Sequence, residues 1–142
     1  MAVYIPYNVP SLKNGKGVGK NGTLFKSKTV SHYLQKIGVA DYSSSKKTYR
    51  NYKDPNRPNL IEQIKPELEE QIKKKEFPIK LGMYFVRDSK RSFDYINAAQ
   101  IILDLMTAHG IIPDDSAEYV TPVFHGYSVE QGKAGVYLNI ID

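Results

Sequence analysis

The stretch from Pro78 to Gly110 constrains the fold more than any other part of the sequence. Between Pro78 and Arg87 an apolar residue occurs at every second position, which is the period of a strand, and the positions are Ile79, Leu81, Met83 and Phe85. A polar corner follows. The next segment, from about Asp94 to His109, has apolar residues at helical spacing, with Gly110 as its stop, and the predicted core positions are Ile96, Ala99, Leu103 and Met106. The chain therefore predicts a helix packed close to a sheet.

Shorter patterns predict the remaining elements. They are a strand at Val3–Ile5, a helix at Thr29–Ile37 that stops at Gly38, a helix capped by Asn59 that contains Pro66, and two strands, Tyr119–Phe124 and Val136–Ile141, joined as a hairpin. Four strands and two or three helices predict an α+β fold, a small mixed four-stranded sheet with the helices packed on it.

Chain length and cysteine content narrow the class of protein. A chain of 142 residues has close to the commonest size for one domain, so we expect a single domain over residues 1–142. Because the chain has no cysteine, disulfide scaffolds, cysteine zinc sites and cysteine nucleophiles are excluded. No apolar run approaches the roughly 20 residues of a membrane span, and the first fifteen residues do not read as a signal peptide. We expect a soluble, cytoplasmic protein with no membrane partner.

Much of the positive charge lies in the stretch Lys46–Arg57 and in the run Lys73–Lys75. The chain has 20 Lys and Arg against 15 Asp and Glu, a formal net charge of +5, which favours polyanionic partners without naming one. The glycine-rich segment 13–22 lacks an apolar period and predicts a loop. The segment 41–59 is basic and rich in tyrosine, which predicts a long loop with a short helix around Lys46–Tyr52. The run Lys73–Lys75 predicts a solvated helix end.

Acidic and amide side chains gather around the helix predicted from Asp94. Asn97 is three residues further on and hence a neighbour on the same face, and Asp104 lies within about 20° of the direction of Asn97. Asp114 and Asp115 follow a glycine turn that would bring the chain back beside this helix. Carboxylate and amide oxygens are the ligands that Mg²⁺ or Mn²⁺ prefers. A structural interpretation is also open, with Asp94 as a helix cap and the aspartate pair in a solvated turn.

The stretch Arg91–Glu118, RSFDYINAAQIILDLMTAHGIIPDDSAE, resembles the core motif of the RusA-type Holliday-junction resolvases. These are small dimeric Mg²⁺-dependent endonucleases whose pattern is D-x-D-N-x-x-K, an Asp four residues after the Lys, then a glycine and a D-D pair. Aligned without gaps, the matching positions are Asp94, Asn97, Asp104, Gly110, Asp114 and Asp115. Pro10–Leu12 followed by a basic loop is also similar to the start of the family. The resemblance covers the last third of the chain well and the first third loosely.

Two positions depart from the family pattern. Ile96 stands where the family has its second acidic ligand, and Gln100 stands where it has a catalytic lysine. The lost carboxylate removes one charge from a metal site, and the lost ammonium removes a stabiliser of charge that develops on phosphate. Two alternatives stay open: an active variant, and a junction-binding or DNA-packaging accessory protein that cuts poorly.

The resemblance implies a RusA-like homodimer that hydrolyses phosphodiester bonds in four-way or branched DNA during recombination or repair. Asp94 and Asp115 would bind Mg²⁺ or Mn²⁺, Asp114 would support the ion, and Asn97 would orient a ligand or a water. A two-fold axis would place paired nicks symmetrically. From their charge and place in the chain, the residues expected to bind DNA phosphates are Lys13, Lys16, Lys20, Lys46, Lys47, Arg50, Lys90 and Arg91.

A third interpretation rests on the tyrosines of segment 41–59. Tyr42, Tyr49 and Tyr52 lie among lysines, a combination that would suit metal-independent RNA binding because aromatic faces stack on bases. Ordinary packing of a long loop is the alternative role for these rings.

Overall fold

The computed structural model describes residues 1–11, 16–18, 24–26, 28–43, 48–51 and 58–142. Its elements in chain order are β1 (Val3–Pro6), β2 (Lys16–Val18), β3 (Leu24–Lys26), α1 (Lys28–Lys36), β4 (Ala40–Ser43), β5 (Thr48–Asn51), α2 (Leu60–Lys73), β6 (Ile79–Arg87), α3 (Tyr95–Ala108), β7 (Val120–Val129) and β8 (Gly135–Ile141). None of the helices in the described part of the chain is long and apolar enough to cross a membrane.

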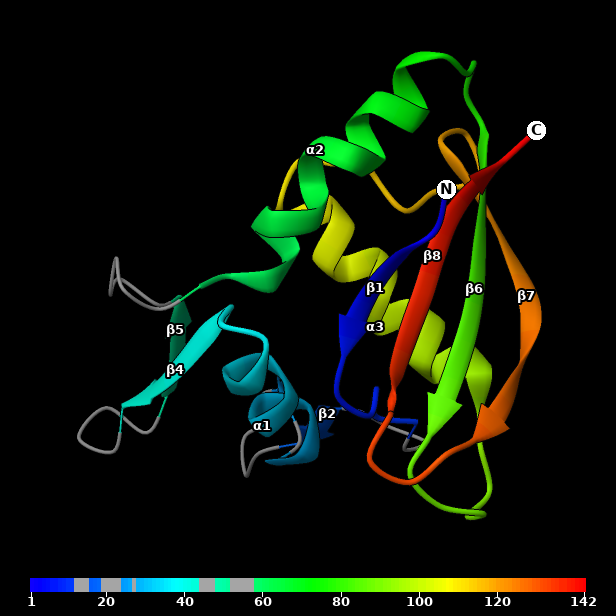
Figure 1. Cartoon of the computed structure of the whole chain (residues 1–142). Helices are drawn as coiled ribbons and strands as arrows, with labels where there is room; N and C mark the ends of the chain where they lie inside the picture. Colours follow the sequence, from blue (N-terminus) through cyan, green and yellow to red (C-terminus); the bar gives the residue numbers. More distant parts are fainter. Residues whose placement is uncertain (12–15, 19–23, 27, 44–47, 52–57) are drawn as a thin grey trace.

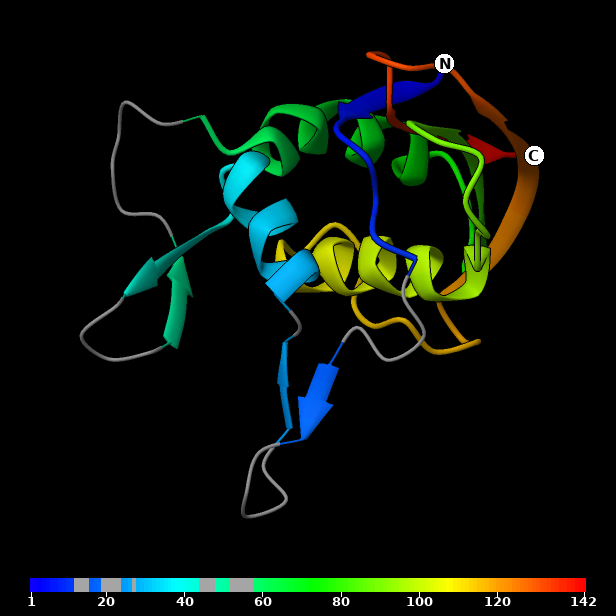
Figure 2. The same ribbon diagram turned by 90° about the horizontal axis from the view of Figure 1, so that it is seen from below.

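Four strands form a mixed sheet in the order β1-β8-β6-β7 (Figure 1). Strand β6 pairs in parallel with β7, whereas β8 pairs antiparallel with both β6 and β1. The three helices lie on one side of this sheet (Figure 2). The predicted α+β class, with a small mixed four-stranded sheet and helices packed on it, is confirmed.

The predicted hairpin between the last two strands is wrong. Strands β7 and β8 do not pair with each other, because β6 lies between them. Parallel strands require a long crossover, and α3 supplies it between β6 and β7. The connection after β7 then crosses the end of β6, where the Glu130 amide donates to the Arg87 carbonyl at 2.9 Å. The near-continuous burial of β6 is typical of such a central strand.

Both segments predicted as loops contain strands, since β2 lies in segment 13–22, and β5 with most of β4 lies in segment 41–59. Strand β2 pairs antiparallel with β3, and β4 pairs antiparallel with β5. The short helix predicted around Lys46–Tyr52 is wrong for Thr48–Asn51, which is strand β5. Strands of three or four residues are too short to show a reliable period, and a β-branched residue and a tyrosine in β5 favour extended backbone. Both pairs project away from the four-stranded sheet (Figure 2).

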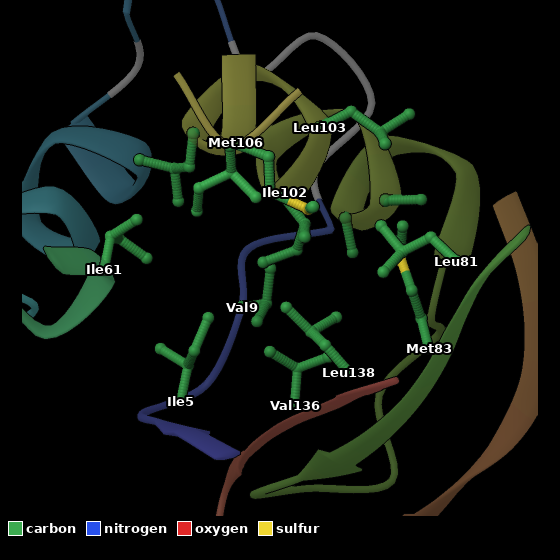
Figure 3. Packing of buried hydrophobic residues seen from close by; sticks show 14 of the residues in the cluster. Ile5, Val9, Ile61, Leu81, Met83, Ile102, Leu103, Met106, Val136 and Leu138 are labelled. Carbon is green, nitrogen blue, oxygen red and sulfur yellow. The ribbon is translucent and has the colours of Figure 1, made fainter. Parts of the chain in front are cut away.

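The hydrophobic core lies between the inner face of the sheet and α3. Figure 3 shows Leu81 and Met83 of β6, with Val136 and Leu138 of β8, pointing toward Ile102, Leu103 and Met106 of the helix. Ile61 of α2 closes the same cluster. The inner positions of β6 predicted from its alternation are thus confirmed as core. This packing fixes α3 on the sheet and leaves its opposite face exposed.

Helices α1 and α2 meet at a tight junction. Asn59 caps α2 as predicted, because its side-chain oxygen accepts from the amides of Ile61 and Glu62 at 2.9 and 3.1 Å. Gly38 ends α1 with φ +80°, and the Ile37 carbonyl accepts from the Leu60 amide at 2.8 Å. A side chain at position 38 would meet the backbone carbonyl of Pro58. Only glycine satisfies both the conformation and this close approach.

Candidate functional site

Asp94 lies at the N-terminus of α3 and caps that helix. Its Oδ1 accepts from the amides of Ile96 and Asn97 at 3.1 and 3.4 Å, and its Oδ2 accepts from the Asn97 side-chain amide at 3.2 Å. The structural interpretation of Asp94 as a helix cap is therefore confirmed. The carboxylate is nevertheless exposed to solvent. Capping stabilises the helix by about 1 kcal/mol and leaves the negative charge accessible.

Gln100 joins two carboxylates that are distant in the sequence. Its Nε2 donates to Asp104 Oδ1 at 2.8 Å and to Asp115 Oδ2 at 2.8 Å. A side-chain amide nitrogen has two hydrogens, so both donors of Gln100 are used. The turn after α3 is thereby attached to the helix, as the sequence analysis expected. Asp114, the neighbour of Asp115, is exposed in the same turn.

The polar residues share the exposed face of α3. At about 100° per residue, Asn97, Gln100 and Asp104 lie within about 60° of one another around the helix axis. The prediction that Ile96 belongs to the core face is wrong, because 64% of its surface is exposed. It lies about 120° around the helix from Ile102, which is at the centre of the buried face.

The fit of these side chains to a divalent ion is partial. In residues 1–11, 16–18, 24–26, 28–43, 48–51 and 58–142, no group of three His, Cys, Asp or Glu residues is placed to hold a metal. The predicted set Asp94, Asp114 and Asp115 is thus not gathered into such a group, and its metal-binding role stays a prediction. Asp104 Oδ1 and Asp115 Oδ2 each lie 2.8 Å from the same atom, Gln100 Nε2. Mg²⁺ commonly uses one or two carboxylates, completed by waters and substrate phosphates.

A buried arginine supports the corner that leads into α3. Arg87 at the end of β6 is 8% exposed, and its guanidinium lies 4.4 Å from the ring centroid of Phe93. It donates to the Val9 carbonyl and, at 3.3 Å, to the Ser11 hydroxyl. Burial lowers the pKa of the Arg87 guanidinium, and the nearby Asp88 carboxylate opposes that change. The side chain thus ties the N-terminal segment to the residue that precedes Asp94.

Two of the predicted DNA-binding residues have described side chains. Lys90 and Arg91 are exposed in the corner between β6 and α3, close in sequence to Asp94. Lys16 lies in β2 and Arg50 in β5, where the structure describes the backbone alone. The others, Lys13, Lys20, Lys46 and Lys47, lie outside the described residues, as does Tyr52. Tyr42 and Tyr49 are register partners in the pairing of β4 with β5.

Two residues that organise this site, Gln100 and Arg87, are not among the site residues predicted from the sequence. Gln100 was noted as a departure from a family pattern, but its spacing to Asp104 is the i, i+4 spacing of side chains that hydrogen-bond on a helix. That signal was available. Arg87 ends an alternating strand on its buried side, and a cation in such a position indicates a specific partner. Neither the Val9 carbonyl nor the Phe93 ring is recognisable from the sequence.

Comparison with known proteins adds no assignment. No protein-family model matches the chain, and no curated protein matches it either.

Proposed function

We propose that this chain is a RusA-like, homodimeric endonuclease that uses a divalent metal ion to hydrolyse phosphodiester bonds in four-way or branched DNA. The observation that carries the proposal is the bond from Gln100 to Asp115, at 2.8 Å, which joins the turn after α3 to the carboxylates of the helix. The family motif combines the same two segments. The exposed cations Lys90 and Arg91 precede this face and suit a phosphate backbone.

Each side chain has a distinct part in the proposed reaction. A divalent ion, Mg²⁺ or Mn²⁺, would supply an activated water and stabilise the charge that develops on the phosphoryl oxygens. Asp94 and Asp115 would bind the ion, and Asp114 would support it. Asn97 orients the Asp94 carboxylate through its side-chain amide, and Gln100 orients Asp115.

Asp115→Asn tests the proposal directly. We expect this variant to lose cleavage of a synthetic four-way junction in Mg²⁺ by at least about a hundredfold, because it removes a charged ligand that stabilises the transition state by several kcal/mol. An asparagine oxygen still accepts from Gln100, so the turn is expected to keep its place. Glu118→Gln removes a charge from the same exposed segment and is the matched control. Wild-type cleavage by Asp115→Asn, or no cleavage by the wild-type protein in Mg²⁺ or Mn²⁺, would overturn the proposal.

A second candidate function is junction binding without efficient cleavage. It is favoured by Gln100, because both of its amide hydrogens are donated to carboxylates at 2.8 Å. An amide in that position partly satisfies the charges that would otherwise attract a cation. Ile96, which is exposed and apolar, stands where the family pattern has an acidic ligand, so the proposed metal site has one carboxylate fewer. Wild-type protein that binds a junction as tightly in EDTA as in Mg²⁺, and cuts in neither, would favour this function.

The path of DNA is tested by comparing two pairs of cations. Changing Lys90 and Arg91 together to alanine is expected to lower the salt slope of junction binding by about 2, since each phosphate contact contributes close to one unit. Changing Lys73 and Lys74 together to alanine removes the same charge and is the control, because Lys73 pairs with Glu70 at 3.9 Å at the far end of α2. Binding titrations between low and moderate salt measure both slopes. Equal slopes for the two variants would contradict the proposed path.

A further inference from the structure

Five large apolar side chains are exposed together beside the edge strand β7. We call them the edge patch, and their exposed fractions are 41% for Tyr95, 64% for Ile96, 39% for Phe124, 54% for Tyr127 and 39% for Val129. Phe124 stacks on Tyr95 with ring centroids 4.2 Å apart. Phe93 contacts both Phe124 and Tyr127, at centroid distances of 6.4 and 5.2 Å. These ring contacts join the first turn of α3 and the edge strand into one surface.

The strand beside the edge patch is open to a further strand. β7 ends the strand order, so within the described sheet its outer edge has no partner strand. Soluble proteins usually protect such an edge with charged residues, prolines or bulges. β7, VTPVFHGYSV, contains no Lys, Arg, Asp or Glu, and its proline and its register irregularity both lie before Gly126. The last four residues, Gly126–Val129, pair regularly with β6 and are unprotected.

The size of the edge patch matches half of a dimer interface. The five exposed fractions amount to somewhat more than two whole side chains, or about 500 Å² at roughly 200 Å² per large side chain. Two copies facing each other would bury about 1,000 Å² of this surface, which is the lower bound for a specific interface. Pairing of the edge strands and the contacts around them would add to that area.

We propose that a second copy of this chain docks on the edge patch, with β7 pairing antiparallel to β7 of the partner across a two-fold axis. An edge strand is its own complement in such an arrangement, and an uncharged strand meets no like charge in its copy. Ile96 and Val129 have no ring to stack on a base, so a nucleic acid would leave them exposed, whereas a protein surface buries them. The proposal rests on the homodimer of the proposed function and names its interface.

The opposite face of the sheet provides a matched control surface. Tyr137 on β8 is 43% exposed, close to the 54% of Tyr127, and belongs to the face that carries no helix. Its neighbour Tyr4, at a centroid distance of 4.8 Å, covers Gly135 and donates its hydroxyl to the Ala134 carbonyl at 2.9 Å. The rings on that face therefore have partners within the chain.

Sedimentation equilibrium, without DNA or metal, tests the interface. We expect the wild-type protein to be a dimer at tens of micromolar, and Tyr127→Lys to weaken dimerisation by at least about a hundredfold, because two like charges would meet near the axis. Tyr137→Lys is expected to remain a dimer. Circular dichroism and thermal melting check that both variants fold. Because the chain has no cysteine, Tyr127→Cys offers a second test: mild oxidation is expected to link it into dimers, whereas Tyr137→Cys stays monomeric on a denaturing gel.

Each contrary outcome overturns the inference in a recognisable way. A monomeric wild-type protein excludes the dimer, and a dimer that Tyr127→Lys leaves intact, or equal cross-linking of the two cysteine variants, places the interface elsewhere. A monomer whose junction binding is lost in Tyr127→Lys assigns the edge patch to nucleic acid instead. A dimer with the expected interface but without cleavage would overturn the proposed nuclease and leave this interface standing.

Discussion

Asp94→Asn is expected to abolish cleavage of a four-way junction in Mg²⁺ while changing the stability of the fold very little. Asparagine caps helices as well as aspartate does, so the bonds to the Ile96 and Asn97 amides are expected to persist. The substitution removes the charge that the proposed ion requires. We expect a loss of at least about a hundredfold in cleavage rate, from the several kcal/mol that such an ion contributes in the transition state. Junction cleavage and thermal melting of the same preparation measure the two effects.

Asp94→Ala is a second way to separate the role of this side chain as a helix cap from its proposed role as a metal ligand. It removes both the cap and the charge, so we expect it to cost about 1 kcal/mol of unfolding free energy in addition to the lost cleavage. If Asp94 acts only as a cap, Asp94→Asn will cut like the wild-type protein and Asp94→Ala will be merely less stable. That pattern would remove Asp94 from the proposed metal site.

Gly38→Ala is expected to destabilise the fold more than a change to alanine at Gly82, Gly110, Gly126, Gly132 or Gly135. Position 38 has φ +80°, which costs an alanine about 1 kcal/mol or more. The added carbon would also meet the backbone of Pro58, lying 2.9 Å from its carbonyl carbon, and overpacking against backbone typically costs another 1–3 kcal/mol. A total of about 3 kcal/mol is expected to lower the melting temperature by about 10 °C. Urea unfolding measures the loss.

Gly132→Ala is the control for this prediction. Gly132 has φ +83°, nearly the same backbone conformation, but nothing lies within 4 Å of the position of an added carbon. We expect it to lose only the conformational part, about 1 kcal/mol. The difference between the two variants isolates the close approach of α1 to the segment before α2. Equal losses would mean that this junction is less tight than the structure shows.

Long periodic segments could be predicted from the sequence, and short or non-local pairings could not. Strand β6 and helix α3 have nine and fourteen residues, enough for their periods and end signals to agree. Asn59 was recognised as a cap because the signal is local. Strands β2 to β5 have three or four residues each, too few to show a period. The neighbours of β8 depend on where α3 crosses the sheet, which no local pattern records.

The candidate site was predictable in composition and not in arrangement. The spacing placed Asn97 and Asp104 on one face of α3, and both do lie on its exposed side. It did not reveal that Asp94 would use both carboxylate oxygens within its own helix turn. Nor did it reveal that Gln100, a residue without charge, would hold Asp115. Such choices among competing hydrogen-bond partners depend on side-chain rotamers and on the path of the turn.

The place of β8 between β1 and β6 governs when the chain is able to fold during its synthesis. In the described sheet β1 pairs with β8 alone, and the register joins Val3 to Leu138. The first strand must therefore wait until nearly all of the residues between them have left the ribosome. Contacts over such a separation form slowly, because a long loop has to close first. A nascent chain that lacks β8 leaves one edge of β6 and the pairing edge of β1 without a partner, and unpaired strand edges of this kind promote aggregation.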